Sequence, residues 1–422
     1  MKPIFKISKS LILSLICATM IFNLVACANI ESNELTAKLR KHSELQSPAE
    51  VEADEAFVSV LTEFSVELFK QTAPTQGDNS VLSPLSAMVC LSMMANGADG
   101  NTLAELETVL GMDIEALNGY LYTYLSKLEQ SSKIKFDSSN SMWLKNDGEL
   151  HVKQEFLENA VRYYDAEVFA SAFDDKTADD INNWVKKKTD GEIKKFIENV
   201  DPDTVMYLIN TLLFEAEWRD PVNESAVRDG TFNNSDGSTS TVSMMSMLES
   251  YYFKHDGVMG FKKGYNGSSL SFVGFLPDER TDVSEFIASL DAAKWAEILD
   301  SQTYANVNLT FPMFEIESKT DLKAALINMG IEAVFSSSES DLSKLGSYSG
   351  RDIYCSFVGQ KATIKVDKNG TKATAATEIQ MNPTSAEPPK ETVELVFDRP
   401  FVYAILDSSG IPIFIGAVNE LG

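Results

Sequence analysis

A run of small side chains near the end of the chain, GTKATAAT at 370–377, constrains the fold because it has two possible conformations. It lies between a strand-like segment and a polar stretch with prolines, where a loop is expected. Yet residues 371–382, taken with a period of two, place small and apolar side chains on one face and mostly polar side chains on the other, which is the pattern of a half-buried strand. Pro383 would end that strand, because proline cannot donate to a ladder. A segment with both patterns suggests two states, and a plain edge hairpin is the simpler alternative.

The N-terminus has the pattern of a secretory signal. Three lysines precede an apolar run over 11–26, which is too short for a comfortable transmembrane helix. The run ends in LVAC at 24–27, which resembles a bacterial lipobox, with a small residue before the cut and the thiol of Cys27 to carry the lipid. An ordinary secretory signal cleaved near the same place is the alternative. We therefore predict a signal peptide over 1–26 and an extracytoplasmic protein, bound to the membrane only through its lipid anchor.

The rest of the chain is predicted to be a polar tether over 27–50 and one domain over 51–422, because no internal repeat or low-complexity linker follows residue 50. The hydrophobic fraction of 44% is typical of a globular protein. A net charge of −26 argues against nucleic acid or an acidic membrane surface as a partner. Cys90 and Cys355 have no metal-type spacing and are predicted to be buried free thiols, although a bridge between them stays open.

The order of the predicted elements indicates an α+β fold. Apolar residues recur at helical spacing early in the chain, and Ser83 followed by Pro84 has the pattern of a helix start. The predicted helices cover 56–71, 83–98 and 178–191. Later segments are rich in β-branched and aromatic residues, as strands are. The predicted strands lie within 204–218, 269–277, 306–317, 363–367 and 400–418. Helices first and strands later argue against alternating βαβ units.

No catalytic motif is complete. GSYSG at 346–350 resembles a nucleophile elbow, but the histidine of that architecture follows the serine, and the three histidines of this chain all lie upstream. Ser132 and Lys135 have S-x-x-K spacing, but the elements that accompany this motif in its families are missing. The scattered histidines predict no histidine-based metal site. We therefore expect neither an enzyme nor a bound cofactor.

Several widely spaced segments match the motifs of one known family in order. These segments are NSVLSPLSAMVCLSMMANGADGNTLAEL (79–106), FDSSNSMWL (136–144), INNWVKKKTDGEIKKFI (181–197), INTLLFEAEW (209–218), the hinge-like run GTKATAAT (370–377) and FDRPF (397–401). On these motifs the chain resembles, over nearly all of residues 55–422, the serpin family of protease inhibitors, whose inhibitory hinge is GTEAAAAT. The resemblance implies three β-sheets, about nine helices and an exposed reactive-centre loop.

For function, the resemblance implies a single-use trap. A serine protease, or alternatively a cysteine protease, cleaves the loop and forms an acyl-enzyme. The hinge then enters the main sheet as a new strand, and the protease is deformed before it can deacylate. The protein would act as a monomer that forms a covalent complex and needs no catalytic residue of its own. The implied hinge is Gly370, Thr371, Lys372, Ala373, Thr374, Ala375, Ala376 and Thr377.

The position of the cleaved bond follows from the family spacing, which puts it fifteen residues along when the hinge glycine is counted first. From Gly370 this gives Thr384, with Ser385 beyond the cut. A small uncharged residue there favours elastase-like proteases over trypsin-like ones. Because the loop is longer than a compact family loop, Met381 and Asn382 flank the second candidate bond.

Several positions depart from the family pattern. Lys368 stands where a glutamate is usual, and Met313 stands where its lysine partner is usual, so no buried charge is left unpaired. Gln360 replaces a histidine of the family. Lys372 and Thr374 fall on the predicted outer face of the hinge, where polar residues are tolerated. The alternative function is a non-inhibitory serpin that acts as an extracellular binding protein, whose hinge usually carries bulky, charged or proline residues.

Overall fold

The computed structural model describes residues 30–41, 45–74, 77–129, 134–201, 204–348, 353–371 and 391–422. Within these ranges the chain forms sheets of seven, nine and two strands and ten α-helices. The predicted α+β fold with three sheets and about nine helices is therefore confirmed. No helix in the described ranges is long and apolar enough to cross a membrane.

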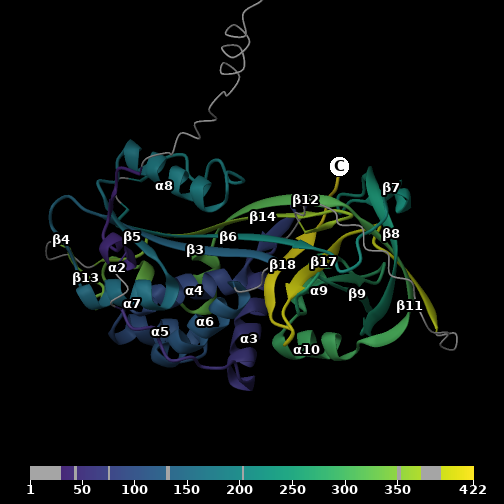
Figure 1. Ribbon diagram of the computed structural model, residues 1–422, viewed down its shortest axis with the longest axis horizontal. Coiled ribbons are helices and arrows are strands. Elements are labelled where there is room, and N and C mark those ends of the chain that lie inside the picture. The colour runs from purple at the N-terminus through teal and green to yellow at the C-terminus, as the bar shows by residue number, and fades with distance from the viewer. Residues whose placement is uncertain are drawn as a thin grey trace, which may run out of the picture.

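The seven-stranded sheet crosses the molecule and separates α8 on one face from α3 to α7 on the other (Figure 1). Its strands, in spatial order, are β1 (Asn33–Glu34), β5 (Glu167–Ser171), β3 (Ile134–Lys145), β6 (Met206–Glu217), β15 (Gly370–Thr371), β14 (Phe357–Val366) and β12 (Phe314–Asp321). β6 and β14 also pair directly over part of their length. Strands from both halves of the sequence thus meet at the middle of the sheet.

The other sheets flank this one. The nine-stranded sheet contains β16 (Thr392–Val396), β11 (Thr303–Pro312), β8 (Thr239–His255), β9 (Val258–Gly264), β10 (Ser271–Pro277), β17 (Phe401–Leu406), β18 (Pro412–Val418) and β2 (Ser80–Leu82), with β7 (Val227–Asn233) paired to β8. The small sheet pairs β13 (Gly346–Tyr348) with β4 (Leu150–Val152).

The helices are α2 (Ala37–Lys41), α3 (Glu55–Thr72), α4 (Pro84–Ala95), α5 (Gly100–Leu110), α6 (Ile114–Glu129), α7 (Gln154–Tyr164), α8 (Asp175–Lys188), α9 (Val283–Ala288), α10 (Ala292–Asp300) and α11 (Lys323–Met329). Two 3-10 turns, η1 (Glu224–Ala226) and η2 (Ala333–Phe335), complete the set. Ser83 caps α4 by accepting a hydrogen bond from the Ser86 amide, and every residue of α4 is buried. A capping box of Asp174 and Thr177 starts α8, so this helix begins three residues before the predicted one.

Two apolar clusters hold the layers together. The larger lies between the sheets and the helices α3 to α7, and the smaller lies between the main sheet and α8. In the smaller cluster, Trp143 and Phe169 stack with ring centroids 4.2 Å apart, and Trp184 and Ile181 cover them from α8. The residues at the start of the described chain also pack here, because Ile30 contacts this cluster.

The predicted tether over 27–50 is wrong for residues 30–41. Asn33 and Glu34 form the edge strand β1, paired with Ala170 and Phe169 of β5, and α2 follows directly. The polar composition suggested an unstructured linker, but main-chain hydrogen bonds to a sheet edge need no apolar side chains. Residues 30–41 therefore belong to the folded domain.

Candidate functional site

The candidate site is a seam between β6 and β14 in the middle of the seven-stranded sheet. At one end these strands pair directly, with 357–361 beside 207–211 in parallel register. At the other end β15 lies between them, with Thr371 opposite Ala216 of β6 and Val366 of β14. Between the two ends, no pairing joins 212–215 to 362–365, all of which the structure describes. β6 and β14 are thus not paired with each other over four positions beside the predicted hinge.

Thr371 is seated in the interior of the sheet. Its side chain is 1% exposed, and its hydroxyl oxygen lies 2.5 Å from the phenol oxygen of Tyr265. Tyr265 stacks on Trp218 with ring centroids 4.8 Å apart. Burial raises the pKa of the Tyr265 phenol well above its ordinary value, so the group stays protonated and can donate or accept in this pair. The first inward-facing side chain of the predicted hinge therefore already lies in the sheet.

Gly370 is required by the closeness of β6. A Cβ atom on this residue would lie 2.1 Å from the carbonyl oxygen of Ala216 and 2.9 Å from the Cα atom of Glu217, which are backbone atoms that cannot rotate away. A tight turn brings the chain to this position, because the Asp367 carboxylate accepts hydrogen bonds from the amides of Asn369 and Gly370 at 2.7 and 3.3 Å. Steric contact with β6 therefore requires glycine at the start of the predicted hinge.

Lys368 has a partner that the sequence did not reveal. Its ammonium group forms an ion pair with the Glu224 carboxylate of η1, and its carbonyl oxygen accepts a hydrogen bond of 2.8 Å from the Val222 amide. The glutamate side chain is 74% exposed, so solvent screens the pair and its contribution to stability is small. Although the family ion pair is absent, Lys368 is partly exposed and is paired with Glu224.

A buried polar network closes the far end of the seam, and of its residues only Gln360 stands out in the sequence. Its amide accepts from the Ser83 amide at 2.7 Å and donates to the Ser83 carbonyl oxygen at 2.9 Å. The Asn210 side chain on β6 donates to Asn140 on β3 at 2.7 Å and also contacts Ser86. The network ties three strands to the start of α4. Serine and asparagine inside otherwise apolar segments were the available signal.

The remaining predicted site residues lie outside the described residues. These are Lys372, Ala373, Thr374, Ala375, Ala376 and Thr377 of the hinge, the candidate bonds Thr384–Ser385 and Met381–Asn382, and the lipidation residue Cys27. The chain is described again from Glu391, whose carbonyl oxygen accepts a hydrogen bond of 2.9 Å from the Asn306 amide at the start of the β11–β16 pairing. The segment after Thr371 therefore begins in one sheet and ends beside another.

Cys90 and Cys355 are free and buried, as predicted, so the bridge between them that the sequence left open is not formed. Burial raises the pKa of Cys355 to about 12 and that of Cys90 further still, so both are neutral thiols without nucleophilic character. Among the described residues no group of three or more histidine, cysteine, aspartate or glutamate side chains could hold a metal ion.

Comparison with known proteins decides the family. The sequence profile described as Serpin (serine protease inhibitor) matches residues 59–421. The chain belongs to the serpin family. Serpin A3-1 of Bos taurus is 30% identical over 375 residues, which cover 85% of this chain and 88% of that protein. Crystal structures of the thermophilic serpin tengpin share 37% sequence identity with this serpin. The native-state structure gives a TM-score of 0.86 over 92% of this chain and all of tengpin, and the latent-state structure gives 0.78 over 89% of this chain and all of that one.

Proposed function

We propose that this serpin is a single-use inhibitor of serine proteases, which traps its target by moving the residues after Thr371 into the seam. One observation carries the proposal. Two hinge residues lie between β6 and β14 at one end, and these two strands do not pair with each other over the next four positions. Since β15 runs antiparallel to both neighbours there, a longer strand in the same direction would pair with β6 on one side and with β14 on the other.

The side chains of the hinge suit this insertion. In the register of β15, Ala373 would lie between Phe214 and Ile364, which are both buried and large. A small side chain fits between them without forcing the strands apart. Lys372 would lie on the opposite face beside Glu215, which is only half-buried. The alternation of small inward and polar outward residues therefore matches the two faces of the sheet at the seam.

Full insertion would also require the closed end to part. There β6 and β14 share parallel pairing over five positions, and the Gln360 network lies beneath them. Exchanging these contacts for two antiparallel ladders along a new strand would give a net gain of main-chain hydrogen bonds. A native state that lacks this strand is then poised to gain stability once cleavage frees the loop, which is the driving force that the trap needs.

Thr384–Ser385 is the bond we propose as the cleavage site, with Met381–Asn382 as the second candidate. Both lie in sequence between Thr371 in the main sheet and Glu391, which hydrogen-bonds to Asn306 beside the nine-stranded sheet. Thr384 is small and uncharged, which favours an elastase-like target. A protease that prefers lysine or arginine would find no such residue at either bond.

The protein is proposed to lie outside the cytoplasm and to be anchored by a lipid on Cys27. Only residues 28 and 29 separate that cysteine from Ile30, which packs beneath α8. At no more than about 3.6 Å per residue, this spacing would hold the α8 side of the domain at the membrane surface instead of on a long tether.

The test is to mix the purified protein with elastase-like, trypsin-like and cysteine proteases, and to combine denaturing gels with mass spectrometry. We expect denaturant-stable complexes with elastase-like enzymes and a released C-terminal peptide that starts at Ser385. A peptide that starts at Asn382 would move the bond to the second candidate. Absence of stable complexes across the panel would reject inhibition and favour the extracellular binding protein.

A further inference from the structure

Strand β3 is paired on both sides over only part of its length. Residues 141–144 lie between β6 and β5, whereas residues 134–140 pair with β6 alone, because β5 begins opposite Ser141. In a β-strand, alternate residues direct their amide and carbonyl groups toward opposite neighbours. Main-chain groups of 134–140 therefore point away from β6, and no strand in the described part of the chain pairs with them. We call this row of groups the free edge of β3.

A cavity of about 410 Å³ lies along the free edge and is lined by residues of β3, α6, α7 and α8. Since the main sheet separates α6 and α7 from α8, a cavity that all three helices line must pass the rim of the sheet (Figure 1). Its apolar wall is formed by Tyr122, Leu125, Phe136, Val161, Tyr163 and Tyr164. The volume is at the lower end of the range for small-ligand sites, about 300–1,000 Å³, so the cavity can admit a few residues of an extended chain but not a folded domain.

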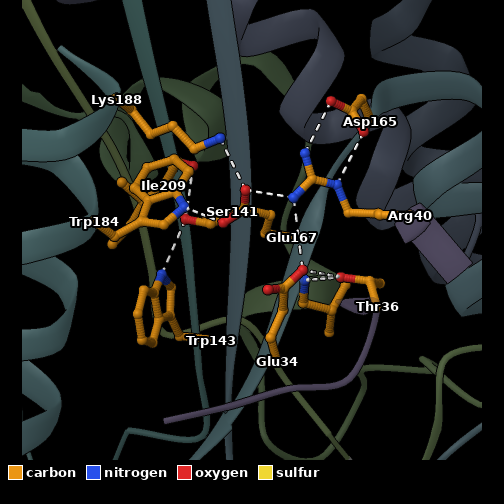
Figure 2. A network of polar contacts seen from close by, with 11 residues as sticks. Glu34, Thr36, Arg40, Ser141, Trp143, Asp165, Glu167, Trp184, Lys188 and Ile209 are labelled. Atoms are coloured by element: carbon orange, nitrogen blue, oxygen red, sulfur yellow. Dashed lines mark hydrogen bonds and ion pairs between the residues drawn. The ribbon is translucent and has the colours of Figure 1, made fainter. Parts of the chain in front are cut away.

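Two of the four charged side chains that line the cavity, Lys188 and Asp165, already have partners (Figure 2). Lys188 pairs with Glu167 at 2.8 Å, and Arg40 donates to both carboxylate oxygens of Asp165 at 2.9 and 3.0 Å. Burial alone would raise the pKa of Glu167, but Lys188 and Arg40 hold it below its usual value, so Lys188 faces a full negative charge at neutral pH. A ligand could bind Lys188 or Asp165 only by breaking one of these contacts.

Arg162, in the last turn of α7, has no partner among the described residues. Its Nε atom is buried without a hydrogen bond, and its guanidinium group forms no ion pair there. Glu158, one turn earlier on the same helix, accepts a hydrogen bond of 3.2 Å from Gln154 instead. Acidic residues outnumber basic ones by 62 to 36 in this chain, so the lack of a partner does not come from a shortage of carboxylates. A guanidinium group binds a carboxylate through two parallel hydrogen bonds, and Arg162 is free to do so.

Two further side chains of β3 limit what can bind. The Ser138 hydroxyl is buried at the cavity without a partner, so it can donate to a ligand. Asp137 also borders the cavity, but its side chain is exposed and falls on the opposite face of the strand from Ser138. This carboxylate would repel a second negative charge on the ligand. The cavity therefore suits a ligand that carries one carboxylate and is otherwise uncharged.

We infer that this cavity binds the C-terminal end of another polypeptide, one with a free carboxylate and an apolar last residue. The end of that chain pairs with 134–140 as an added edge strand, which is how short extended segments bind open sheet edges. Arg162 and Ser138 hold the terminal carboxylate. The last side chain lies against the buried side chains of Leu125 and Phe136. The free edge, the unpartnered guanidinium group and the apolar wall are then all occupied by one ligand.

The first experiment measures peptide binding by isothermal titration calorimetry. The probe is acetyl-TVTL, whose β-branched residues favour an extended chain and whose last residue is apolar. The free acid should bind, and its C-terminal amide should bind at least about tenfold more weakly, because the charge-assisted hydrogen bonds to Arg162 are lost. Acetyl-TVEV-amide, which carries its carboxylate on an internal side chain, should bind as weakly as the amide. Equal binding of the three peptides, or no measurable binding of the acid, would overturn the inference.

Arg162→Gln tests the charged contact. The variant should bind the acid at least about tenfold more weakly and leave the weak binding of the amide unchanged. Ser138→Ala should weaken the acid about threefold. Both variants should unfold at the wild-type temperature, because the Nε atom of Arg162 and the Ser138 hydroxyl have no hydrogen bond to lose. Lys153→Gln is the matched control, since it removes an exposed cation at the start of the same helix and should change the affinity by less than about twofold. Wild-type affinity of Arg162→Gln for the acid would contradict the proposed site.

Backbone pairing is tested with N-methylated peptides and hydrogen–deuterium exchange. Methylation of alternate backbone nitrogens removes either the amides that face β3 or those that face away from it, so one pattern should abolish binding and the other should preserve it. Exchange of 134–140 should slow in saturating peptide, whereas 141–144, already paired on both sides, should not change. Equal effects of the two patterns, or protection only outside 134–140, would reject strand addition. No protease enters these assays, so the failure of the proposed inhibition would be seen separately.

Discussion

The hydroxyl oxygen of Thr371 lies 2.5 Å from the phenol oxygen of Tyr265, and both side chains are buried. This hydrogen bond and the pairing with β6 and β14 hold Thr371 inside the sheet. Tyr265 is held from behind by Trp218, whose indole nitrogen donates to the Asp367 carbonyl oxygen at 2.8 Å. The turn before the hinge and the first hinge side chain are therefore anchored on the same aromatic pair.

This pair can be tested by a double-mutant cycle. Tyr265→Phe and Thr371→Val should each cost about 1–3 kcal/mol, because each leaves one buried hydroxyl without its partner. The double variant should cost less than the sum, since it replaces both partners with apolar groups of similar shape. The measurement is the midpoint of the first unfolding transition in urea. Strictly additive costs would show that the two hydroxyls do not interact.

Gly370→Ala should displace the hinge from the seam. The new methyl group would meet the Ala216 carbonyl oxygen at 2.1 Å, so β15 could not keep its pairing with β6. Hydrogen–deuterium exchange of the peptides that contain 366–371 and 212–217 should rise, while α4 stays protected. Asn369→Ala is the matched control, because Asn369 contacts Asp367 and Trp218 through main-chain hydrogen bonds that alanine keeps. Unchanged exchange in Gly370→Ala would mean that the backbone of β6 at Ala216 shifts enough to accommodate the new methyl group.

The sequence predicted those parts of the fold that depend on local pattern or on the family resemblance. Ser83 and Pro84 marked the start of α4 correctly, because capping and the fixed φ of proline act within one turn. The period-two pattern of 371–382 predicted that Thr371 points inward, and the side chain is indeed buried. Both signals are contained in a few neighbouring residues.

Contacts between distant segments could not be predicted in this way. The Asp180 carboxylate accepts from the Ser32 amide 148 residues away, and Lys368 pairs with Glu224 of the distant 3-10 turn η1. Neither partner has a distinctive pattern of its own, and the polar composition of residues 30–41 predicts a tether. Polar segments that pair through their backbone leave almost no hydrophobic periodicity to detect.

The lipid anchor is tested by Cys27→Ser. Since only a thiol can carry the lipid, the variant should move from the membrane fraction to the medium or keep an uncleaved signal peptide. Fractionation followed by mass spectrometry of the N-terminus measures both outcomes. Wild-type membrane association with normal processing would contradict the lipobox interpretation and favour an ordinary secretory signal.

Thr371→Arg tests strand insertion at the first inward-facing position. The guanidinium group would have to enter a site that is 1% exposed and offers one phenol oxygen as its partner, at a cost of several kcal/mol. The hinge should therefore stay outside the sheet and insertion should slow, while acylation and deacylation keep their rates. The protease would then escape, and the variant should be cleaved at the wild-type bond without forming a stable complex.

Lys372→Arg is the matched control for that variant, because it places the same side chain one residue further along, where the register of β15 puts it on the outer face beside half-buried Glu215. It should inhibit with nearly the wild-type stoichiometry. Both variants carry an arginine in the hinge, but only Thr371→Arg must bury it. The comparison therefore separates the effect of an arginine in the hinge from the effect of burying it inside the sheet. Stable complexes from Thr371→Arg at wild-type stoichiometry would mean that the seam does not accept the hinge during inhibition, whereas loss of complexes in both variants would mean that positive charge near the loop blocks protease binding instead.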